Sequence, residues 1–295
     1  MSSNSVLALT ASSTRYLATL AHPTFFPFPL GLVLHAARTS LAHQHLVRAS
    51  STWKSTPWSA YLAGFFILAW GGGVSSHVLL GLPPPQLYSA RPWVGYLAVH
   101  LALTFLGPLL KFEKIPPRVM DTLCLPIDTL LRVISIFSAL NLLTPAPGSP
   151  LQVNPLLAAS PIVPLFLGAI ASSGGGTLAS ALSVWEPEWR LRSPGWMRAG
   201  VGLRGSVDVW GGAVAAGVWC FLAGQQPFYQ NLRVTVYEVL GVKPTVVDAG
   251  DARAVATLVL GTLFAWRVYG VHWAPINAEN AQQQKKPKGN DAKSQ

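Results

Sequence analysis

Residues 59–80 read SAYLAGFFILAWGGGVSSHVLL, a run of 22 residues with no charged side chain and with three successive glycines near its middle. A helix needs about 20 predominantly apolar residues to cross the ~30 Å hydrocarbon core of a bilayer. A helix also satisfies its own backbone hydrogen bonds where no water is present. This stretch therefore predicts a membrane-spanning helix.

Six other apolar stretches lie on either side of it, separated by breaks rich in proline. The chain is 51% hydrophobic and 11% charged, whereas soluble domains carry about 25% charged residues. We therefore predict an all-α integral membrane protein with seven transmembrane helices. The predicted spans are residues 25–41, 59–80, 93–110, 120–142, 158–183, 203–223 and 253–273.

The lysines and arginines between these spans are distributed unevenly. Alternate loops and the C-terminal tail hold 13 of them, and the other side holds 5. Because cytosolic loops carry an excess of Lys and Arg, this asymmetry predicts an N-terminus outside the cytosol and a C-terminus inside it. We expect an extracytosolic N-terminal segment at 1–24, a membrane domain at 25–273 and a disordered basic cytosolic tail at 277–295.

The glycine triplet has a counterpart later in the chain. Residues 67–73 read ILAWGGG and residues 170–176 read IASSGGG, at an offset of 103 residues. Three glycines cost a helix about 3 kcal/mol relative to alanine, so matching triplets indicate a repeat, although the chain has 26 glycines in all. Small residues let helices approach closely, or let a helix break beside a cavity.

An odd number of helices per repeat forces the two repeats into opposite orientations. We therefore expect repeat one at 25–110, an inverted repeat two at 120–223 and a separate seventh helix at 253–273. Inverted repeats with interrupted helices are typical of transport proteins. The predicted glycine hinges are Gly71, Gly72, Gly73, Gly174, Gly175 and Gly176.

Five charged residues in predicted spans are the pore or gating candidates, because a charge there costs at least ~2.5–3.5 kcal/mol. Asp128 and Arg132 are spaced i,i+4 and are expected to pair on one helical face. Either Asp128 attracts a cation while Arg132 gates or binds an anionic lipid, or the two simply neutralise each other. Asp208 is expected to pair with Arg204 one turn away. Arg204 and Arg267 either line a pore or extend to the membrane surface.

Other classes of site find little support in the sequence. The two cysteines, Cys124 and Cys220, lie in apolar segments and predict neither a disulfide framework nor a zinc site. His35 and His77 lack a second ligand at metal-binding spacing. Since no catalytic constellation stands at a span end, we expect no enzyme, no metal and no cofactor. Orientation in a membrane explains where the basic residues lie along the chain, so we expect no nucleic-acid partner.

Several motifs along roughly residues 26–270 resemble those of the trimeric intracellular cation channel (TRIC) family. Their order and spacing along seven helices carry the resemblance. They are FPFPLGLVLH at 26–35, WGGG at 70–73, LGLPP at 80–84, GP at 107–108, GAIASSGG at 168–175 and WEPE at 185–188.

The resemblance implies a homotrimer in which each subunit has its own pore for monovalent cations, chiefly potassium. It implies counter-ion flow for calcium release in the endoplasmic reticulum or nuclear envelope, with a lumenal N-terminus. It also implies contact with membrane lipids and a phosphoinositide site in the fourth helix, where Arg132 is the lipid-binding candidate. At the family's charged positions this chain has Asp128, Thr129 and Ala171 instead.

Two other membrane functions fit the same plan. A secondary transporter would also use inverted repeats. A seven-helix receptor would share the orientation, although the glycine triplets and the loops without a cysteine pair argue against it.

Overall fold

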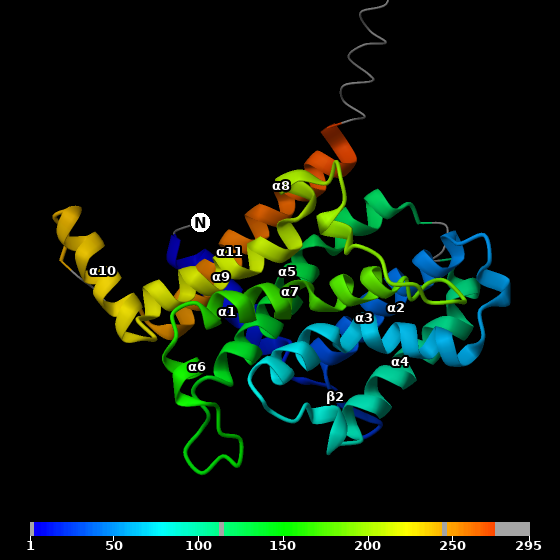
Figure 1. The fold of residues 1–295 in the computed structure, drawn as a ribbon, viewed down its shortest axis with the longest axis horizontal. Coiled ribbons are helices and arrows are strands. Elements are labelled where there is room, and N and C mark those ends of the chain that lie inside the picture. The colour runs from blue at the N-terminus through cyan, green and yellow to red at the C-terminus, as the bar shows by residue number, and fades with distance from the viewer. Residues whose placement is uncertain (1–2, 112–114, 244–246, 275–295) are drawn as a thin grey trace, which may run out of the picture.

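The structure is a computed structural model, which describes residues 3–111, 115–243 and 247–274, and it is built almost entirely of helices (Figure 1). Seven long helices account for most of these residues. They are α2 (Leu30–Ala49), α3 (Trp58–Leu79), α4 (Arg91–Leu110), α5 (Pro117–Asn141), α7 (Val163–Leu182), α9 (Val207–Ala223) and α11 (Ala249–Val268).

Shorter elements connect the long helices. Proline at the first turn of α4, α5, α6, α7 and α10 marks where these helices begin, since proline needs no hydrogen-bond partner there. The shorter elements are α1 (Ser3–Tyr16), β1 (Leu20–His22), β2 (Phe26–Pro29), α6 (Pro155–Ala159), α8 (Gly202–Gly205), α10 (Pro227–Val239), the 3-10 turns η1 (Trp53–Ser55), η2 (Pro85–Leu87) and η4 (Gly195–Met197), and a π-helical end to α11 at η5 (Tyr269–Trp273).

The chain is an all-α membrane protein. Among the described residues, α3, α4, α5, α7 and the α11–η5 segment are long and apolar enough to cross a bilayer. The pair of α9 and α10 passes the same test only when it is counted as one span bent by 75°. The structure thus supports five or six spans by length and composition. Each of the seven predicted segments overlaps one long helix.

Helix α2 is the long helix whose composition is least suited to lipid. Its polar side chains Ser40, His43 and Gln44 are buried inside the bundle, where α2 packs against α3, α4 and α5. Polar residues that face other helices do not meet lipid, so a low average hydropathy does not by itself place α2 outside the membrane.

The beginning of the predicted first span is wrong in the structure. Residues 26–29 form β2, which pairs antiparallel with β1, and the helix begins only at Leu30 and continues to Ala49. The N-terminal segment at 1–24 includes helix α1, which packs against α11 and α5. The predicted tail at 277–295 lies outside the described residues.

Helix α7 is central to the bundle, where it packs against α3, α5 and α9 (Figure 1). Glycines on two of its contacts make this packing close. A Cβ atom on Gly175 would lie 2.0 Å from the Leu68 carbonyl oxygen of α3. A Cβ atom on Gly168 would lie 2.3 Å from the Gly212 carbonyl oxygen of α9. Backbone therefore meets backbone on both contacts, as small residues permit in membrane helices.

Candidate functional site

The two glycine triplets meet each other at the contact between α3 and α7, which we call the glycine seam (Gly71, Gly72, Gly174 and Gly175). A Cβ atom on Gly71 would lie 2.9 Å from the Gly175 Cα, and one on Gly174 would lie 2.7 Å from the Gly72 Cα. Both helices continue through their triplets without a break. The structure therefore shows no break at the triplets, and the role of their glycines as hinges stays a prediction. The triplets bring two backbones together.

The seam is reciprocal under the 103-residue offset of the sequence repeat. Gly72 faces the Ala171 carbonyl oxygen, and its counterpart Gly175 faces the carbonyl oxygen of Leu68, which is the counterpart of Ala171. The pairs Gly71–Gly175 and Gly174–Gly72 are related in the same way. Such an exchange of partners is what a local two-fold axis between the two helices produces.

A cavity of about 600 Å³ opens beside the seam. Gly73 and Gly176, the last glycines of the two triplets, both line it, and neither would bring a Cβ atom within 4 Å of another residue. The rest of the wall combines apolar side chains with polar and charged ones. Its polar and charged lining includes His35, Arg38, Tyr96, Asp128, Arg132, Ser172, Ser173, Thr177, Ser180 and Asp208.

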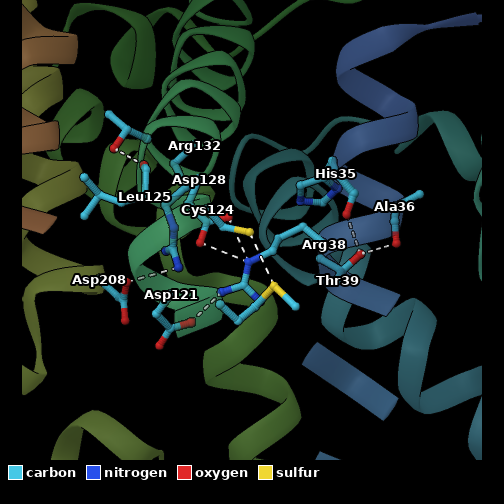
Figure 2. Close-up of polar contacts among 12 residues, drawn as sticks. His35, Ala36, Arg38, Thr39, Asp121, Cys124, Leu125, Asp128, Arg132 and Asp208 are labelled. Atoms are coloured by element: carbon cyan, nitrogen blue, oxygen red, sulfur yellow. Dashed lines mark hydrogen bonds and ion pairs between the residues drawn. The ribbon is translucent and has the colours of Figure 1, made fainter. Parts of the chain in front are cut away.

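Arg38 of α2 forms the first part of a charged cluster in this region (Figure 2). Its Nε lies 3.0 Å from Asp128 Oδ1, and its Nη2 lies 2.8 Å from Asp121 Oδ1. Asp121 also accepts a contact from His272 Nε2 at 3.0 Å. One guanidinium thus bridges two carboxylates that lie two turns apart on α5.

Arg132 of α5 forms the second part. Its Nη2 lies 3.0 Å from Asp208 Oδ1 on α9, and Arg267 Nη2 of α11 lies 3.5 Å from Asp208 Oδ2. Arg132 also donates to the Ser172 carbonyl oxygen of α7 and lies over the Phe264 ring, 5.0 Å from its centre. We call the residues of the two parts the charge chain: Arg38, Asp121, Asp128, Arg132, Asp208, Arg267 and His272.

The local pairs predicted from sequence spacing are not the ion pairs that the structure forms. Asp128 pairs with Arg38 and Arg132 pairs with Asp208, although Asp128 and Arg132 are one turn apart on α5. Likewise Asp208 pairs with Arg132 and Arg267. The Arg204 guanidinium instead lies 4.9 Å from the centre of the Trp266 ring. Gly270 has no side chain, and the Arg204 side chain occupies the position that a Cβ atom on Gly270 would take. The cross-helix pairs join separate elements of the bundle.

A second cavity, of about 540 Å³, lies next to the first. Asp121 and Arg267 line the second cavity, whereas Asp128, Arg132 and Asp208 line the first. Arg38 and Ala42 line both. The ion pairs of the charge chain therefore connect residues of one cavity with residues of the other, and Arg38 stands at the boundary.

The charge chain is electrically balanced and only partly exposed. Its three arginines and three aspartates cancel, and the side chains of the five ion pairs are between 20% and 32% exposed. Such a balanced set limits the cost of placing charge among apolar helices.

Four of the five predicted site residues belong to this cluster, and Arg204 does not. Three members of the charge chain were not predicted: Arg38, Asp121 and His272. Arg38 lies near the end of the predicted span 25–41 and counts only among the basic residues of the cytosolic side. Asp121 stands at the beginning of a predicted span. It lies two turns before Asp128 on the same helical face, and this spacing was the signal in the sequence. Within the described residues, no three His, Cys, Asp or Glu side chains are grouped so that they could hold a metal ion.

Comparison with known proteins gave no relative: no family model, no curated protein and no solved structure matches this chain.

Proposed function

We propose that this protein conducts monovalent cations, with potassium as the expected ion, along a path through the two cavities. One observation carries the proposal. Arg38 lines both cavities and holds a carboxylate of each, Asp128 in the first and Asp121 in the second. The Arg38 guanidinium occupies the boundary that an ion would cross.

Movement of Arg38 would change both the space and the charge at that boundary. Without the guanidinium, Asp121 and Asp128 would present two carboxylates, one to each cavity. Rings and pairs of carboxylates favour cations over anions in membrane pores. The Arg132–Asp208–Arg267 group, two arginines on one aspartate, would keep its ion pairs and would hold α5, α9 and α11 together. We therefore assign the gate to Arg38 and a supporting role to the second group.

The proposed membrane arrangement has seven spans, with α2 included and α9 crossing as a helix of its own. The reciprocal glycine seam supports two inverted repeats, because a two-fold axis relates the contacts of α3 and α7. We propose a lumenal N-terminus and a cytosolic C-terminus in the endoplasmic reticulum or nuclear envelope. The TRIC resemblance adds a homotrimer with one path per subunit, counter-ion flow for calcium release as its role, and a phosphoinositide at Arg132.

Planar bilayer recording with purified full-length protein tests the proposal. Replacing Arg38 by glutamine removes the charge and keeps a hydrogen-bond donor. Loss of its two ion pairs, together worth about 1–3 kcal/mol once glutamine keeps a hydrogen bond, predicts a rise of about 5- to 150-fold in the ratio of open to closed channels. Arg190→Gln is the matched control, because the Arg190 side chain is exposed in a loop and its pair with Glu188 is 3.7 Å long.

Three results would contradict this assignment. They are the absence of current from the wild-type protein, a current carried by anions, and equal open probabilities for Arg38→Gln and Arg190→Gln. A measurement of the melting temperature of each variant separates a gating effect from loss of the fold.

A secondary transporter is the second candidate, and the same boundary favours it. Two cavities closed off from each other by breakable ion pairs are also what alternating access requires. The recording decides between them, since a transporter gives substrate-dependent flux without unitary currents.

A further inference from the structure

Helix α10 leaves the bundle at a sharp angle. Three residues separate it from the end of α9, and the two helix axes are bent by 75°. In Figure 1 it projects, in yellow, away from the other helices at the left of the view. Among the helices, α10 packs mainly against α9.

The bend is held by specific contacts. Gly224 ends α9 in the left-handed region at φ 61°, a conformation that glycine adopts readily. Arg233 of α10 is 7% exposed and donates to the carbonyl oxygen of Leu222, in the last turn of α9, at 3.0 Å. The Tyr229 hydroxyl donates to the Pro161 carbonyl oxygen at 2.7 Å, and Gln226 donates to Ala158 at 2.7 Å. The direction of α10 is therefore fixed from both sides.

The helix presents an exposed apolar row. Phe228, Leu232 and Val239 are spaced i, i+4 and i+11 and so lie on one face, and their exposed fractions are 51%, 40% and 81%. Asn231 and Glu238, at a spacing of seven residues, form a polar row about 100° further round the helix. In water three large apolar side chains would not be left open along one row without a partner.

The geometry points to a lipid surface as that partner: we infer that α10 lies along the membrane boundary with Phe228, Leu232 and Val239 inserted among the lipid acyl chains. Helix α9 has 17 residues and rises about 25 Å, slightly less than the ~30 Å hydrocarbon core. Because α10 is turned by 75°, its 13 residues add only about 5 Å of depth. The polypeptide therefore reaches the membrane boundary at the end of α9, and α10 continues along that boundary.

This arrangement has the features of an interfacial amphipathic helix, whose apolar side sinks about 5–10 Å into the boundary while its polar side stays with the headgroups. It depends only on α9 crossing the membrane and not on conduction. Failure of the channel proposal would leave it unaffected.

Nitroxide labels at two neighbouring positions test the inference. Cysteine is placed at Val239 or at Glu238 in full-length protein carrying Cys124→Ser and Cys220→Ala, reconstituted in phosphatidylcholine vesicles. Both side chains are exposed, so neither substitution disturbs packing. We expect the ratio of collisions with oxygen to collisions with a water-soluble nickel complex to be several-fold higher at Val239 than at Glu238.

Three outcomes would overturn the inference. Free access of the nickel complex to Val239 would place α10 in water. Protection of Val239 from both reagents would mean that a second copy of the chain covers the row. Equal, oxygen-rich ratios at Val239 and Glu238 would place α10 inside the hydrocarbon core as a re-entrant segment. A label at Phe228 provides an independent reading if the Val239 variant does not fold.

Discussion

At the scale of single residues, glycine has two different roles within one triplet. Gly175 forms the seam, whereas Gly176, the next residue, lines the cavity and touches nothing within 4 Å of a would-be Cβ atom. The difference follows from the 100° turn between successive helical residues, which points one toward α3 and the other toward the open space.

Replacing Gly175 by alanine tests the seam. The added methyl group would meet the Leu68 carbonyl oxygen, which belongs to the backbone and cannot move aside. We expect the free energy of unfolding to fall by about 1–3 kcal/mol or more, as for other overpacked cores. Gly176→Ala is the control and should be neutral, or more stable by up to about 1 kcal/mol because alanine favours the helix. Unfolding in a mixed-detergent titration measures both, and similar losses in the two variants would refute the seam.

The site residues were only partly predictable from the sequence. Asp128, Arg132, Asp208 and Arg267 were identifiable, because a charge within an apolar run is conspicuous. Their partners were not, since i,i+4 spacing permits a local pair while a cross-helix pair depends on packing. Arg38 was missed for another reason: Ser40, His43 and Gln44 follow it, and their burial among other helices cannot be seen in the local hydropathy.

At the scale of elements, each predicted span begins and ends within about five residues of its long helix, and the end of α2 is the exception. Long apolar runs dominate local preference, and proline marks where helices begin. Helices α1 and α10 were not predicted, because they are short and only partly apolar. Strand β2 was placed inside a helix, although Pro27 and Pro29 disfavour one there.

Helix α11 carries one side-chain cap that can be tested. Asp248 accepts a hydrogen bond from the Gly250 backbone nitrogen at 2.8 Å, at the beginning of the helix. We expect Asp248→Ala to lower the free energy of unfolding by about 1 kcal/mol. Asp248→Asn keeps the acceptor oxygen and should lose much less. The melting temperatures of the two variants provide the measurement, and equal losses would show that the charge rather than the cap matters.

At the scale of the whole molecule, the number of spans decides where the two ends lie. An odd number places them on opposite sides of the membrane, and an even number places them on the same side. Sequence asymmetry favours seven, while length and composition of the helices support five or six. The difference rests on α2 and α9, whose polar content and short length make an average hydropathy a poor guide.

Cysteine labelling in sealed vesicles tests the seven-span arrangement. We expect Thr24→Cys, exposed in the turn between β1 and β2, and Ser294→Cys to react with a membrane-impermeant maleimide from opposite sides. The native cysteines are replaced in both proteins, and detergent-opened vesicles show that each site can react. Labelling of both sites from one side would rule out seven spans.

The glycine seam can form only after the ribosome has made both of its helices. Gly71 and its partner Gly174 are 103 residues apart in the chain, so at about 5–20 residues per second the ribosome needs roughly 5–20 seconds to reach the second after the first. During that interval the glycine face of α3 lacks the α7 backbone that later covers it, so this face meets lipid or an insertion factor. A slowed ribosome between α4 and α7 would prolong this exposed stage. The speed of translation between α4 and α7 therefore sets how long this face stays without its partner.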